Sequence, residues 1–127
     1  MPSVERGDIV WVTFPDPNDV PDEEFENPHP AIVIQNNSRN HEYDTTIVAP
    51  LTTAQNRSQA LADVRVSSAS EDVEEDSIAK LGMLTTVSVP GRIMDESDNP
   101  EVWKMGELSA SKMDDIEKHL DLVLGLS

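Results

Sequence analysis

Hydrophobic residues along this chain mostly recur at the spacing of short β-strands. Residues 8–14 (DIVWVTF) are largely apolar on both faces, as is typical of a strand in a small barrel. Further strands are predicted at 31–35, 46–51, 62–66 and 102–108, with one or two more in 77–89. Pro50 predicts an edge or a bulge in its strand, Gly82 predicts a bulge, and Asn36-Asn37 predicts a turn.

One helix is predicted, at the C-terminal end. Ser109 is a favourable N-cap and Gly125 a favourable end, with Met113, Ile116, Leu120 and Val123 between them at helical spacing. Residues 15–30 are rich in proline and acids and predict a long loop, and 67–76 and 90–100 predict polar connectors. The pattern predicts a mainly β, α+β fold: a small SH3-like β-barrel with a C-terminal helix, forming one domain over residues 1–127.

The charge balance is unusual, with 25 Asp and Glu against 9 Lys and Arg and a formal net charge of −16. Such a surface repels nucleic acid at low salt. Either the chain binds a basic partner or metal, or it comes from a salt-accumulating organism. The second interpretation is favoured, because the acids are spread along the chain and molar salt screens them.

Several classes of protein are disfavoured. The chain has no cysteine, which excludes disulfides and thiolate metal sites. Its histidines, His29, His41 and His119, form no H-x-x-x-H pair, so we expect no metal site and no cofactor. We also expect a cytoplasmic protein without a membrane segment, because no targeting segment or long apolar run is visible.

Four blocks, in order, carry a resemblance to a known family: 6–12 (RGDIVWV), 29–37 (HPAIVIQNN), 46–53 (TIVAPLTT) and 76–81 (DSIAKL). They resemble the MazF/PemK (Kid-like) family of toxin–antitoxin ribonucleases, and the acidity indicates a haloarchaeal-type member. The resemblance implies a homodimer that cuts single-stranded RNA without metal. The expected partner is a cognate antitoxin peptide, and DNA is a further candidate ligand. The implied chemistry is attack of a 2′-hydroxyl on the adjacent phosphate, leaving a 2′,3′-cyclic phosphate and a 5′-hydroxyl.

The resemblance also implies the catalytic residues. His29 stands where the family has an arginine; it can act as acid or base but cannot offer a guanidinium fork. A solvated loop residue is an equally good interpretation of His29. Thr52 matches the family's catalytic threonine or serine, although a strand-end hydroxyl that caps the backbone is the alternative. A groove between residues 15–30 and the end of the third strand should bring the two together.

Other residues complete the expected nucleic-acid groove: Glu24, Gln35, Asn36, Thr53 and Arg57. Glu24 lies among other acids, so a generic acidic loop is favoured for it. For Arg57, as for Arg39, an ordinary surface arginine is the favoured interpretation.

The fourth block departs from the family, with Gly82 and Thr85 replacing an acid and an arginine. Three functions therefore remain open. The first is a toxin-type endoribonuclease. The second is a catalytically degraded member that binds RNA, DNA or an antitoxin. The third, ranked lower, is a structural or regulatory dimer.

Overall fold

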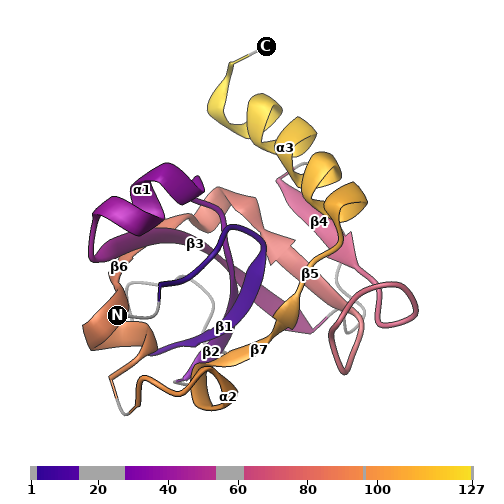
Figure 1. Ribbon diagram of the computed structural model, residues 1–127. Helices are drawn as coiled ribbons and strands as arrows, with labels where there is room; N and C mark the ends of the chain where they lie inside the picture. Colours follow the sequence, from indigo (N-terminus) through magenta and orange to yellow (C-terminus); the bar gives the residue numbers. More distant parts are fainter. Residues whose placement is uncertain (1–2, 15–27, 54–61, 96, 127) are drawn as a thin grey trace.

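The computed structural model describes residues 3–14, 28–53, 62–95 and 97–126, and these fold into one curled antiparallel sheet with a C-terminal helix (Figure 1). The strands are β1 (Asp8–Val12), β2 (His29–Val33), β3 (Thr45–Thr53), β4 (Asp63–Val66), β5 (Ser77–Lys80), β6 (Thr85–Ser88) and β7 (Lys104–Glu107). Their order is β4-β5-β3-β2-β1-β7, and β6 also pairs with β3. The predicted barrel-like α+β architecture is confirmed, as a half-barrel.

Two short α-helices were not predicted, and neither was the π-helical turn η3 (Val89–Ile93), which lies at the start of the segment predicted as a polar connector. At Asn36-Asn37 the prediction of a simple turn was wrong: Asn36 accepts a hydrogen bond from the Arg39 N–H and begins α1 (Asn37–Glu42). Helix α2 (Pro100–Trp103) is capped by Asn99 in the same way, so the last strand begins at Lys104 rather than at residue 102. Both helices are too short to show a hydrophobic period.

Pro50 does not mark an edge strand, because β3 lies inside the sheet. The Ile47 carbonyl accepts from the Ile34 N–H, so the backbone N–H and C=O groups of odd-numbered β3 residues point towards β2. The backbone nitrogen of Pro50 therefore points to the opposite side of β3. On that side β6 pairs as far as Val48, and β5 begins pairing at Leu51. The missing N–H of Pro50 therefore falls at the break between two partners, where no ladder bond is lost. Gly82 likewise lies in a 3-10 turn between β5 and β6, not in a bulge.

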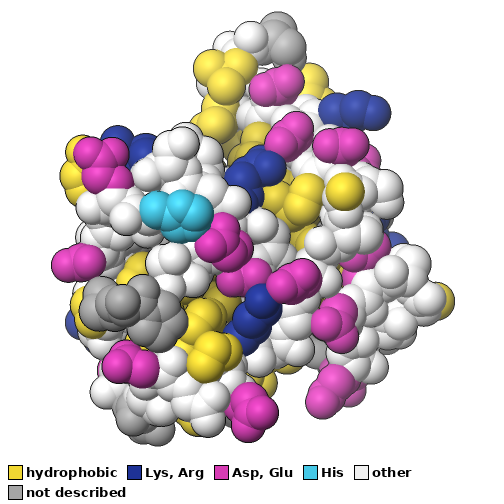
Figure 2. Space-filling view, in the orientation of Figure 1, with side chains coloured by type: hydrophobic (Ala, Val, Ile, Leu, Met, Phe, Trp, Pro, Cys, Tyr) yellow, Lys and Arg dark blue, Asp and Glu magenta, His cyan; other side chains and the backbone are white. Residues whose placement is uncertain are grey.

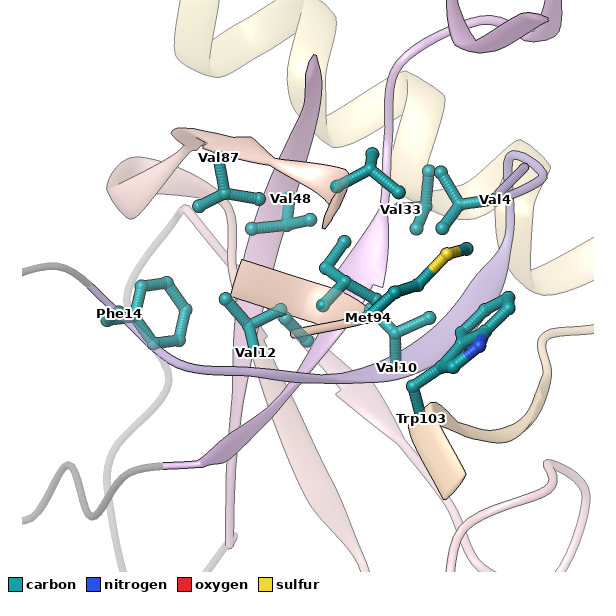
Figure 3. Packing of buried hydrophobic residues seen from close by; sticks show 12 residues of the cluster. Val4, Val10, Val12, Phe14, Val33, Val48, Val87, Met94 and Trp103 are labelled. Carbon is teal, nitrogen blue, oxygen red and sulfur yellow. The ribbon is translucent and has the colours of Figure 1, made fainter. Parts of the chain in front are cut away.

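Apolar side chains on the two faces of the sheet build two cores. Inside the curl, Val10, Val12, Val33 and Val48 pack with Trp103 and other buried residues (Figure 3). The opposite face packs under α3 (Ala110–Leu124), which buries Met113, Ile116 and Leu120. The predicted helix is confirmed with Ser109 as its N-cap and Gly125 as its C-cap, while Val123 is only partly buried.

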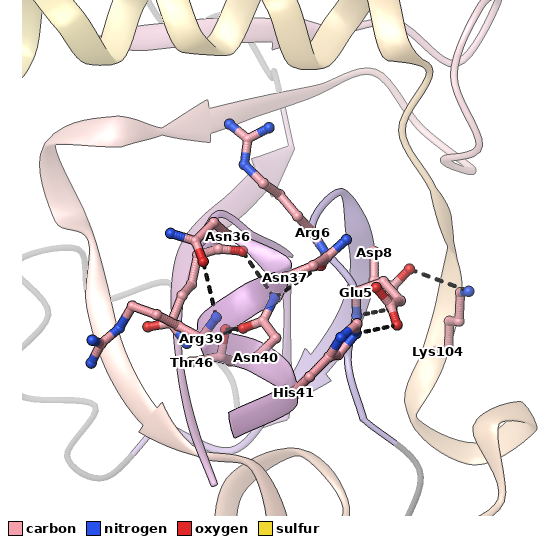
Figure 4. Close-up of polar contacts among 11 residues, drawn as sticks. Glu5, Arg6, Asp8, Asn36, Asn37, Arg39, Asn40, His41, Thr46 and Lys104 are labelled. Atoms are coloured by element: carbon pink, nitrogen blue, oxygen red, sulfur yellow. Dashed lines mark hydrogen bonds and ion pairs between the residues drawn. The ribbon is translucent and has the colours of Figure 1, made fainter. Parts of the chain in front are cut away.

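The turn before β1 links the N-terminal segment to α3 and β7. Gly7 has a φ of 93°, which disfavours a side chain there. The Arg6 Nε donates to the Ile34 carbonyl, and its guanidinium pairs with Glu117 at 2.8 Å. Asp8 accepts from the Glu5 N–H and pairs with Lys104 at 3.2 Å (Figure 4). Burial raises the pKa of the Asp8 carboxyl, although both partners act to lower it. The residues that open the first sequence block (residues 6–12) therefore have structural roles in this turn.

A buried amide network holds α1 on the sheet (Figure 4). The Asn40 Oδ1 accepts from the Thr46 hydroxyl at 2.7 Å and from the Gln35 Nε2 at 3.0 Å. The Asn40 Nδ2 donates to the Gln35 carbonyl at 2.9 Å. Asn40 and Thr46 are almost fully buried, so water does not replace these bonds.

Replacing Asn40 by alanine is expected to lower the free energy of unfolding by about 3 kcal/mol, because buried partners lose their hydrogen bonds. Urea unfolding in molar KCl measures this. Asn99→Ala, which removes an exposed cap, is the matched control and should cost about 1 kcal/mol or less. Equal losses in the two variants would show that the network contributes no more than a surface cap.

Acidic side chains are spread over the visible face of the molecule, with few basic ones between them (Figure 2). Hydrophobic side chains gather over the end of α3, where Leu122, Leu124 and Leu126 are exposed. Among the described residues, no helix has the length and apolar character needed to cross a membrane.

Candidate functional site

His29 begins β2 and lies beside Leu51 of β3. Its Nε2 is 2.6 Å from the Leu51 carbonyl oxygen. A carbonyl only accepts, so Nε2 carries the hydrogen in this contact. In the neutral ring the lone pair is then on Nδ1. The imidazole also contacts the Phe14 ring, with centroids 6.4 Å apart. Backbone and core contacts therefore fix the orientation of the half-buried ring.

Thr52 is the second-last residue of β3 and is only 8% exposed. Its backbone pairs with Ile78 of β5. The hydroxyl has no hydrogen-bond partner among the described residues. A buried hydroxyl without a partner is costly, so this one is a candidate ligand contact.

The strand register brings these two residues together. In the β2–β3 ladder, Ala31 pairs with Pro50 and Ile32 with Ala49. When this register is continued by two residues, His29 lies opposite Thr52. Both residues line one pocket of about 350 Å³. The pocket continues along an apolar wall formed by Trp11, Pro30, Val73 and Met105.

The other residues singled out in the sequence are distributed differently. Thr53 is exposed and lines the same pocket. Gln35 is buried in the Asn40 network, and Asn36 caps α1; neither lines the pocket. Glu24 and Arg57 lie outside the described residues.

The two positions of the fourth block that depart from the family pattern lie away from this pocket. Gly82 is in the turn after β5, and the Thr85 hydroxyl donates to the Met83 carbonyl at 3.1 Å. Neither residue is among those that line the pocket. Arg39, the other cation considered, stacks on Tyr43 at 4.6 Å from the ring centroid and is not a lining residue.

Two acids and one indole line the pocket without having been singled out in the sequence. Glu74 and Glu75 reach it from the β4–β5 connector, and no Lys or Arg among the described residues lines it. Trp11 was assigned only to a strand face, yet it is 36% exposed. The exposure of this indole in an otherwise buried strand becomes visible only in the folded chain.

This arrangement combines a titratable imidazole, a buried hydroxyl donor and an aromatic wall. The imidazole can move a proton, and the hydroxyl can donate to an anionic oxygen. In the part of the chain that the structure describes, no group of three or more His, Asp or Glu side chains is placed to hold a metal ion.

Comparison with known proteins supplies an independent line of evidence. A family model described as PemK-like, MazF-like toxin of type II toxin-antitoxin system matches residues 5–124. The chain is 28% identical to an Endoribonuclease MazF of Staphylococcus epidermidis, over 98% of this chain and 93% of that one.

Solved structures share the fold. A mycobacterial endoribonuclease in complex with its cognate antitoxin aligns with a TM-score of 0.68 and 20% identity, covering 98% of this chain and 97% of that chain. A MazE-MazF structure from Deinococcus radiodurans aligns with a TM-score of 0.69 and 15% identity over the whole of both chains.

Proposed function

Because this chain belongs to the PemK-like, MazF-like family of type II toxin–antitoxin toxins, we propose that it is a metal-independent endoribonuclease that cuts single-stranded RNA. In this proposal His29 performs the acid–base chemistry and Thr52 binds the reacting phosphate. Residues 1–127 act as one domain. Glu24, Gln35, Asn36, Thr53 and Arg57 remain candidates for nucleic-acid contacts.

The observation that carries the proposal is the Thr52 hydroxyl. It is buried and has no partner among the described residues, and Thr52 is one of the residues that line the same pocket as His29. A phosphate oxygen bound there accepts the hydroxyl hydrogen and satisfies the group. The gain is largest when negative charge develops on that oxygen, which is the condition for transition-state stabilisation.

The proposed reaction breaks one P–O bond and forms another. The 2′-oxygen attacks phosphorus as a base removes its proton, and the 5′-oxygen leaves as it receives one. The lone pair on His29 Nδ1 makes this nitrogen the base, while Nε2–H stays on the Leu51 carbonyl. In an in-line displacement the leaving oxygen lies on the far side of phosphorus from Nδ1, so it takes its proton from water, and Nδ1 later releases its proton to solvent. The products are a 2′,3′-cyclic phosphate and a 5′-hydroxyl.

Trp11 supports a single-stranded substrate. An exposed indole beside the phosphate site stacks an unpaired base, and such stacking favours single strands over duplex. A base in a duplex is already stacked on its neighbours and is not available to Trp11.

The proposed partners are a cognate antitoxin peptide and a second copy of the chain. Leu122, Leu124 and Leu126 at the end of α3 offer apolar surface for association. DNA remains a secondary candidate, because it lacks the 2′-hydroxyl that the reaction uses.

One observation favours a second candidate function, a binding module with a degraded site. Glu74 and Glu75 line the pocket, and no Lys or Arg among the described residues does so. Without a Lys or Arg the negative charge that develops on the phosphate oxygens is less stabilised, so such a site binds RNA without cleaving it.

A cleavage assay decides between these two functions. Purified protein in molar KCl with EDTA is incubated with a long single-stranded RNA. We expect cuts at short sequences, with 2′,3′-cyclic phosphate ends. Binding of the same RNA without cleavage would establish the binding module instead.

The acidic surface is proposed to be an adaptation to a salt-rich cytoplasm, as in haloarchaea. We therefore expect the melting temperature to rise by several degrees between 0.1 M and 2 M KCl, because salt screens repulsion among the carboxylates. Calorimetry at several KCl concentrations measures this, with sucrose as a control for general solute effects. An unchanged melting temperature would point to a basic partner as the reason for the acidity.

A further inference from the structure

The β4–β5 connector carries five acids, and three of them hold the connector in place: Glu71, Asp72 and Asp76. Glu71 accepts from the Ser109 N–H at 2.8 Å and from its hydroxyl at 2.7 Å, at the start of α3. Asp72 accepts from the Glu107 N–H at 3.4 Å. Asp76 accepts from the Ser68 N–H at 2.8 Å.

Glu74 and Glu75, which lie between these anchors, differ from them. Their carboxylates have no hydrogen-bond or ion-pair partner among the described residues. Both line the pocket that contains His29 and Thr52. Val73 beside them packs on the second core. The connector is therefore anchored on both sides, and the two acids left without partners are the two that face the site.

The pocket chemistry restricts what these carboxylates bind. Ionised carboxylates only accept hydrogen bonds, so they repel a phosphate and need a ligand with N–H or O–H donors. The Trp11 indole and the Met105 side chain provide apolar contacts for a flat group. Thr52 lines the same pocket and has a buried hydroxyl without a partner among the described residues, which indicates, independently of the acids, that a ligand belongs there.

We propose that Glu74 and Glu75 recognise a guanine base next to the reacting phosphate, while Trp11 stacks on that base. This inference rests on the proposed nuclease function and names the sequence preference of the same site. Guanine presents two adjacent donors, N1–H and the 2-amino group, which match the two oxygens of a carboxylate. Uracil has a single N–H that lies between two carbonyl groups, and a carboxylate repels the oxygens of these carbonyls. Adenine and cytosine present an amino group beside a ring acceptor.

Binding of uncleavable RNA tests this preference directly. The probes are fluorescent 2′-O-methyl oligouridines with one central guanosine, inosine, adenosine or cytidine, and the measurement is anisotropy in molar KCl. We expect the guanosine probe to bind about tenfold more tightly than the others, because hydrogen bonds to a charged group are strong. Inosine lacks only the 2-amino group and should lose most of the advantage.

Variants assign the effect to the two acids. In Glu74→Gln, Glu75→Gln and the double variant, the preference for guanosine should shrink. Binding of plain oligouridine should rise, because negative charge is removed. Glu42→Gln on α1 makes the same change at an exposed position outside the pocket and should keep the preference.

Each outcome either supports or overturns the proposal. Equal binding of all probes, or a guanosine preference that survives in the double variant, overturns it. If RNA is cleaved but without guanosine at the mapped sites, the base assignment is wrong and the nuclease function stands. If RNA is neither bound nor cut, both fail. Loss of binding to a basic antitoxin peptide in the double variant, with base preference unchanged, assigns the acids to that peptide instead.

Discussion

Replacing His29 by alanine is expected to reduce RNA cleavage by about 10²–10⁴-fold, the range found when a general acid–base group is removed. The ring lies in the same pocket as Thr52, and its Nε2–H is held by the Leu51 carbonyl. Alanine removes both the titrating nitrogen and this contact. Initial rates on a short single-stranded RNA in molar KCl measure the loss.

A His29→Gln variant separates the two losses. A glutamine amide can still donate towards the Leu51 carbonyl, but it does not titrate. The wild-type rate should depend on pH through protonation of the imidazole, and this dependence should be absent in His29→Gln. Equal rates in wild type and His29→Gln would show that the histidine only positions the strand.

His29→Arg introduces the residue that the family resemblance leads one to expect. A guanidinium offers two parallel donors to a phosphate, which a histidine does not. Tighter RNA binding by this variant than by His29→Gln would show that the pocket holds the phosphate beside position 29. Glu74 and Glu75 reduce the gain, because they lie on the same pocket.

The strands were predictable because alternating apolar residues face two cores. Val10 and Val12 pack on one side of β1, and Ile9 packs on the other. The same reasoning failed at Pro50, where the break between β5 and β6 that accommodates proline is a property of the folded sheet. It failed at α1 because six residues are too few to show a helical period.

The candidate site was only partly predictable, for a similar reason. His29 stands in the second sequence block and Thr52 in the third. The β2–β3 register brings them together, and the order of the two blocks with a turn signal between them anticipates this strand pairing. Glu74 and Glu75 come from a connector whose path depends on contacts of Glu71 with Ser109. No local pattern distinguishes the acids that anchor this connector from those that face the pocket.

Replacing Thr52 by valine is expected to change stability and activity in opposite directions. Valine has nearly the same shape and removes a buried hydroxyl that has no partner in the described chain. The free energy of unfolding should therefore rise by about 1–2 kcal/mol, the cost of leaving such a group unsatisfied. Cleavage should fall by about 10–100-fold, because a donor to the developing anion is lost.

Thr46→Val is the matched control, since it makes the same change at another buried threonine of β3. The Thr46 hydroxyl donates to Asn40 at 2.7 Å, so valine there should cost about 1 kcal/mol and leave the pocket untouched. Urea unfolding and cleavage rates of both variants in molar KCl give the comparison. If Thr52→Val also destabilised the protein, its hydroxyl would already be satisfied in the free protein. The threonine would then be a structural residue of the strand end, and the case for a phosphate contact at this position would fail.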